Sequence, residues 1–285
     1  MLDTYGYIYS YCIRIDHNMK RGSEMTAPQA VSQQNPSKVA FGKVLAIQIV
    51  AYVVLVALAL VPGIAYGDSA NPAVVPFTII GSLAMIALLV VFSPFRDGTA
   101  GHAIAVIAGL LSVVCATTMT LGRAIFAADA TGGKDFSMED GWIAGVGGLL
   151  ILLIVISFGR QMARENRTHL IRSLSHSVVE GVAMIASAGW CFLPVLLPTT
   201  HSRAAAMSAA SGATVDMFSN VTTTWVVAAI VTVLVAVALT VCSYFWHRDA
   251  DPEPDARSPW IGLALLPVML TGLAVGLAAL AIVVL

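Results

Sequence analysis

The sequence predicts an all-α integral membrane protein with seven transmembrane helices in one bundle. Of its 285 residues, 58% are apolar or aromatic and only 11% are charged, whereas about 25% are charged in soluble domains. A soluble chain of this length cannot bury so much apolar surface. The apolar residues also form continuous runs and do not alternate with polar ones. This pattern excludes a membrane-spanning β-barrel.

Seven apolar runs account for the predicted helices, because about 20 mostly apolar residues cross a bilayer as a helix. They cover residues 44–64, 74–92, 103–121, 142–158, 178–197, 224–245 and 260–285. Tryptophans at the ends of runs are expected to form an aromatic belt at the membrane surface. The tryptophans in such positions are Trp142, Trp225, Trp246 and Trp260.

The distribution of Lys and Arg between the runs predicts the orientation, because cytoplasmic loops carry the excess of basic residues. One set of connections holds nine: Lys38, Lys43, Arg96, Arg160, Arg164, Arg167, Arg172, Arg248 and Arg257. The opposite set holds three: Arg123, Lys134 and Arg203. We therefore expect a multi-pass protein of the plasma membrane, with its N-terminus in the cytoplasm and its C-terminus outside. The preference for Arg over Lys favours a bacterial source.

Residues 1–43 are expected to be a disordered cytosolic leader, and residues 44–285 the membrane domain. The stretch 26–40 is rich in Ala, Pro, Gln, Ser and Asn, a composition that does not fold by itself. Residues 20–24 read Lys-Arg-Gly-Ser-Glu directly before Met25, which is what a purine-rich ribosome-binding site encodes when it is translated. Two interpretations remain open: translation starts at Met25, or residues 1–24 form a short tail. Mass spectrometry of the native N-terminus distinguishes them.

The most informative ionisable residues lie at the start of the fifth run. His169, Arg172, His176 and Glu180 are spaced so that they share one face of a helix. Because intramembrane ionisable groups often mark functional sites, one interpretation is an ion site, a proton site or a contact with lipid. The alternative is structural. Basic residues between Arg160 and Arg172 would bind anionic lipids of the inner leaflet, and His176 would neutralise Glu180 one turn away.

Other polar and small residues within the runs predict contacts between helices. Gln48 lies inside the first run, where an amide is expected to hydrogen-bond a neighbouring helix. Gly141 and Gly145 form one GxxxG pair, and Gly272 and Gly276 form another. Such pairs let two helices approach closely.

The sequence contains no motif that predicts catalysis, a metal or a cofactor. Its four cysteines form no CxxC pair, and neither a phosphate-binding GxxxxGK[ST] loop nor HExxH occurs. The net charge of −1 provides no broad basic surface for nucleic acid. We therefore expect no catalytic residue, metal or cofactor. The expected partners are the lipid bilayer and another membrane protein.

Three classes of function remain open. The first is a non-catalytic membrane subunit or scaffold that acts through helix–helix contacts, which the glycine pairs favour. The second is a small-solute transporter or channel with a polar path near Gln48 and Glu180. The third is a lipid-modifying membrane enzyme, for which His102, His169, His176 and Glu180 are the available titratable groups. The scarcity of such groups disfavours the enzyme.

Overall fold

The computed structural model describes residues 41–65, 75–95, 99–118, 137–163, 170–197, 220–249 and 258–284. Every element in these ranges is helical. The α-helices are α2 (Phe41–Ala65), α3 (Val75–Val91), α4 (Thr99–Thr117), α6 (Met138–Met162), α7 (Leu170–Ser187), α9 (Asn220–Asp249) and α10 (Pro259–Val284). A 3₁₀-helix, η3 (Ala188–Leu196), directly continues α7. The expected leader and the possible start at Met25 lie outside the described residues.

The helices have the length and composition of membrane spans. Six of them are long and apolar enough to cross a bilayer, counting α7 and η3 as one span. The apolar helix α3 is shorter, at 17 residues, which is the lower limit of about 17 residues for a spanning helix. The predicted all-helical fold is confirmed for the described residues, and the apolar helices are consistent with a multi-pass membrane bundle.

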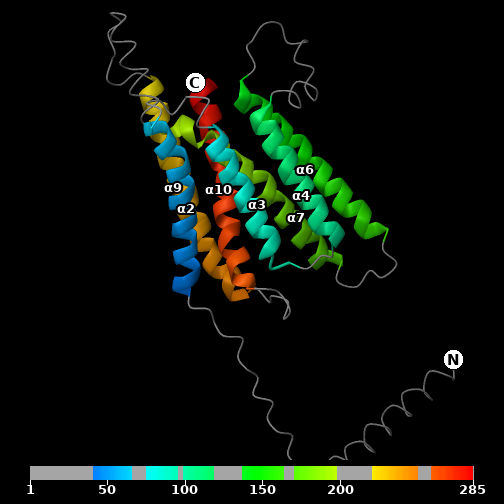
Figure 1. Ribbon diagram of the computed structural model, residues 1–285. Coiled ribbons are helices and arrows are strands. Elements are labelled where there is room, and N and C mark those ends of the chain that lie inside the picture. The colour runs from blue at the N-terminus through cyan, green and yellow to red at the C-terminus, as the bar shows by residue number, and fades with distance from the viewer. Residues whose placement is uncertain are drawn as a thin grey trace, which may run out of the picture. The chain divides into compact units, whose positions relative to one another are not determined.

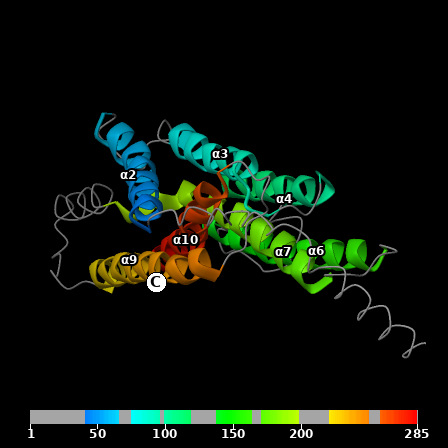
Figure 2. The ribbon, with the colours of Figure 1, turned by 90° about the horizontal axis from the view of Figure 1, so that it is seen from below.

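The bundle is organised around α10. This helix packs against α9 and α2, and also against α7 and η3. Helices α4, α6 and α7 pack against one another on the side away from α2 and α9 (Figure 2). Successive helices run in opposite directions, so α2 begins at one end of the bundle and α10 finishes at the other (Figure 1).

The start of α6 follows directly from its sequence. Ser137 accepts a hydrogen bond from the backbone N–H of Asp140, while the Asp140 carboxylate accepts one from the backbone N–H of Ser137. This reciprocal capping satisfies amide groups that a helix otherwise leaves without partners. It explains why α6 begins before the apolar run at Trp142. Helix α4 likewise begins before its predicted run, so that His102 lies in its first turn.

The fifth predicted span changes its helical type at Ala188. The 3₁₀ segment has 9 residues and contains Pro194, although such segments are rarely longer than 3–4 residues. Hydroxyl groups of neighbouring helices bond to the backbone just before the change. Ser82 of α3 donates to the Ser187 carbonyl at 3.0 Å, and Ser112 of α4 donates to the Ile185 carbonyl at 2.8 Å.

Glycines bring α10 into direct backbone contact with α7 and η3. A β-carbon at Gly189 would overlap the carbonyl oxygen of Gly272, and one at Gly272 would overlap the carbonyl oxygen of Ala186. A β-carbon at Gly276 would overlap the ring of Trp142. These positions have no room for a side chain.

Trp142 corrects the expectation of a surface belt at this position. Its side chain is 0% exposed, and its Nε1–H donates to Ser112 Oγ at 3.1 Å. The ring lies against Gly276, so the missing side chain of the glycine creates the space that the indole fills. Trp142 is therefore a core residue that joins α6 to α10.

Candidate functional site

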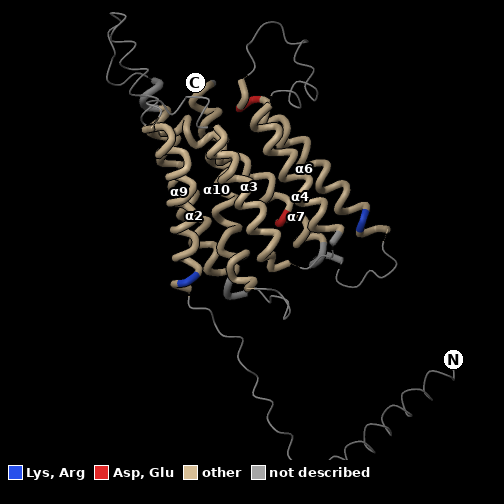
Figure 3. The backbone as a smooth tube through the Cα atoms, in the orientation of Figure 1, with Lys and Arg blue, Asp and Glu red and all other residues tan. Residues whose placement is uncertain are grey.

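Glu180 is the one buried charged side chain in the part of the chain that the structure describes. Its side chain is 1% exposed, and it is the single acidic residue of α7. The other charged positions marked in the described helices lie toward helix ends (Figure 3). A carboxyl group inside a membrane bundle is costly to bury and marks a candidate site.

The partner of Glu180 comes from another helix. His102 of α4 places its Nδ1 atom 2.8 Å from Glu180 Oε1, and the His102 side chain is 24% exposed. The other carboxyl oxygen, Oε2, is buried without a hydrogen-bond partner among the described residues. The pair thus combines a partly exposed imidazole with a buried carboxyl group that still has a free acceptor atom.

Other buried polar side chains belong to α7 and to its neighbour α6. Ser177 of α7 is buried, and so are Ser157 and Gln161 of α6. Ser157 and Gln161 follow Leu153 at helical i, i+4 spacing. Leu153 itself lies against Gly181 of α7, where an added β-carbon would come within 2.6 Å of its side chain. The polar residues of α6 therefore share the face that packs on α7.

The structure describes three of the four residues that were predicted to share one helix face. His169 lies outside the described residues. Arg172, His176 and Glu180 all belong to α7. The His176 ring stacks on Phe95 with the ring centroids 4.5 Å apart.

Sequence reasoning missed the pairing of Glu180 with His102, which it named only as a group for the enzyme interpretation. The available signal was that both residues lie near the same end of their predicted spans. That signal does not distinguish His102 from His176 or His169 as the partner. The structure shows the contact with His102 because α4 and α7 pack closely against each other.

Gln48 belongs to a separate polar cluster. Its Nε2 donates to Ser243 Oγ of α9 at 2.9 Å, while its Oε1 is buried without a partner among the described residues. Tyr52 OH and Thr271 Oγ1 of α10 lie 2.9 Å apart, and Thr271 donates to the Pro267 carbonyl. Gln48 thus connects α2 to α9, whereas Glu180 connects α7 to α4. The structure does not bring these two residues together.

The predicted glycine pairs lie at helix contacts. Gly141 is buried in α6, and a β-carbon at Gly145 would come within 2.7 Å of Cys115 Sγ in α4. Gly272 and Gly276 contact α7 and Trp142, as described above. Within the ranges described, no group of three or more His, Cys, Asp or Glu side chains is placed to hold a metal ion.

Comparison with known proteins does not assign a function to these residues. No protein-family model matches the sequence, and no curated protein or solved structure matches it. The function is therefore inferred from the residues and their geometry.

Proposed function

We propose that the protein is a small-solute transporter or channel in which Glu180 and His102 bind and release a proton. The observation that carries this proposal is the buried carboxyl group of Glu180, which contacts the His102 imidazole at 2.8 Å and retains an unpartnered oxygen. Chains of carboxyl and imidazole groups relay protons in membrane pumps and transporters.

A proton is the occupant that this geometry favours. An unpartnered buried acceptor costs about 1–3 kcal/mol, and more when it is charged. A proton on the carboxyl group removes the charge and needs no additional space. Protons are counted from a neutral imidazole that faces an ionised carboxylate. One added proton is shared between His102 Nδ1 and Glu180 Oε1. A second added proton leaves an imidazolium beside a neutral carboxylic acid.

The difference in exposure of the two side chains supports a direction of proton transfer. His102 is partly exposed in the first turn of α4, whereas Glu180 is almost completely buried. An imidazole changes its protonation near neutral pH. His102 would therefore exchange protons with the solution at this end of the bundle and pass them to Glu180.

Glu180→Gln is expected to abolish proton movement, because an amide has a similar shape but cannot accept a proton. The protein would be reconstituted into liposomes that contain a pH-sensitive dye, and an imposed pH gradient would start the reaction. We expect the wild-type rate to exceed that of protein-free liposomes, and the Glu180→Gln rate to equal it. Glu139→Gln is the matched control, because Glu139 lies in the first turn of α6, and it should retain the wild-type rate.

Proton movement in the Glu180→Gln variant at the wild-type rate would contradict the proposal. So would a wild-type protein that moves no protons under any imposed gradient. The second result would favour the membrane subunit or scaffold that the glycine pairs predict. A partner would then pack on α2 and α9, whose spans are only 22% and 17% buried.

We also propose that the end of the bundle where α2 begins faces the cytoplasm. The excess of Lys and Arg in the connections at that end supports this orientation. A reporter that is active only outside the cytoplasm should be active when fused after Leu285. The same reporter inserted after Arg167 should be inactive. The reverse pattern would contradict the orientation.

A further inference from the structure

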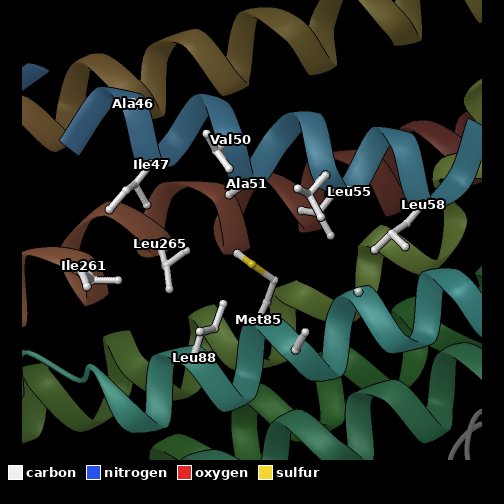
Figure 4. A pocket seen from close by; sticks show the side chains of 13 residues that line it. Ala46, Ile47, Val50, Ala51, Leu55, Leu58, Met85, Leu88, Ile261 and Leu265 are labelled. Carbon is white, nitrogen blue, oxygen red and sulfur yellow. The ribbon is translucent and has the colours of Figure 1, made fainter. Parts of the chain in front are cut away.

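An apolar groove lies between α2 and α3, with α10 beneath it. Its volume is about 350 Å³. Side chains of all three helices face it, among them Val50 of α2, Leu88 of α3 and Leu265 of α10 (Figure 4). All the residues that line it are apolar. The groove is separate from the His102–Glu180 pair, which lies between α4 and α7.

One exposed basic residue continues the line of the groove along α2. The wall that α2 contributes runs from Ala46 to Leu58. Lys43 precedes Ala46 by three residues and Ile47 by four, so it shares their helix face. Its side chain is exposed. The groove is therefore apolar along its length, with a positive charge just beyond one end.

We propose that this groove holds one acyl chain of an anionic phospholipid, with the lipid phosphate at Lys43. The apolar groove is complementary to an acyl chain, and the cation beyond its end is complementary to a phosphate. This inference is independent of the proposed proton function, because it uses different helices and different residues.

The shape of the groove suits an acyl chain. The stretch of α2 from Ala46 to Leu58 is about 18 Å long at 1.5 Å per residue. A groove of this length with a volume of about 350 Å³ admits one narrow hydrocarbon chain.

The charge at Lys43 determines which lipid is preferred. Acyl chains in a bilayer already lie in an apolar medium, so transfer into the groove provides little hydrophobic gain. Selectivity must then come from the headgroup. One basic residue near the membrane surface corresponds to about a fivefold preference for an anionic lipid.

Lipid retention by the full-length protein tests this proposal. The protein would be taken from nanodiscs of equal parts phosphatidylglycerol and phosphatidylcholine and examined by native mass spectrometry. We expect one retained phospholipid, with about a fivefold preference for phosphatidylglycerol. Ala84→Phe, which fills the groove from α3, should lose the bound lipid. Ala238→Phe makes the same change on an exposed position of α9 and should retain it.

The headgroup contact has its own pair of variants. Lys43→Gln should retain a bound phospholipid but lose the preference for phosphatidylglycerol, whereas Lys43→Arg should keep that preference. Retention of lipid by Ala84→Phe at the wild-type level would overturn the groove as the site. An unchanged preference in Lys43→Gln would overturn the role of the charge. This second test remains decisive if Ala84→Phe does not fold.

Discussion

Replacing Gly189 with alanine is expected to prevent the bundle from assembling. A β-carbon at this position would overlap the carbonyl oxygen of Gly272, so the obstacle is the backbone of α10. Overpacking against flexible side chains typically costs about 1–3 kcal/mol. Here α10 would have to move away from η3, and we expect a loss above about 3 kcal/mol, which is a large part of the stability of a typical protein.

Gly147→Ala is the matched control for this prediction. Gly147 belongs to α6, and a β-carbon there would meet no atom within 4 Å. Alanine is the better helix former of the two residues, so this variant should be at least as stable as the wild type. The measurement is the yield of monodisperse protein in detergent, together with its thermal midpoint. A Gly189→Ala protein with the wild-type yield and thermal midpoint would contradict the close contact between the backbones of η3 and α10.

Removing His102 is expected to destabilise the protein strongly, because Glu180 then remains buried without its partner. A buried polar group left without its hydrogen-bond partner costs about 1–3 kcal/mol, and more when it is charged. We therefore expect His102→Leu to lose about 3 kcal/mol, because Glu180 is only 1% exposed. The thermal midpoint in detergent should fall accordingly.

The double variant His102→Leu/Glu180→Leu separates charge burial from packing. Replacing both members of a buried pair by apolar residues is often neutral or stabilising. The double variant should therefore be more stable than His102→Leu alone, yet it should move no protons in liposomes. The single variants His102→Leu and Glu180→Leu complete the comparison. If the stability lost in the double variant equals the sum of the losses in the two single variants, the pair is not energetically coupled.

The sequence predicts the positions of the long apolar helices well because a bilayer imposes a simple requirement on a chain that crosses it. Every backbone group must be bonded within its own helix, and about 20 apolar residues are needed to cross. The run around Val50 meets this requirement through local composition alone. Composition does not reveal that the fifth span becomes a 3₁₀-helix at Ala188. The hydroxyl groups that bond to the backbone just before the change, those of Ser82 and Ser112, come from other helices.

The partners of individual residues are harder to predict because they come from distant parts of the sequence. His102 and Glu180 are 78 positions apart, whereas His176 is only one turn away from Glu180. Likewise, the GxxxG pattern identifies Gly276 as a packing position but does not reveal that the indole of Trp142 fills the space beside it. Both contacts depend on which helices are neighbours.

The most direct test of the central claim is an infrared titration of the Glu180 carboxyl group in the reconstituted protein. A carboxylic acid has a carbonyl stretching band that disappears when it loses its proton. The chain has 16 Asp and Glu residues, so the difference spectrum between acidic and alkaline pH contains several such bands. We predict that one of them belongs to Glu180: it should be present in the wild type and in Glu139→Gln, and missing in Glu180→Gln. The same band in Glu180→Gln would contradict the assignment of proton binding to Glu180.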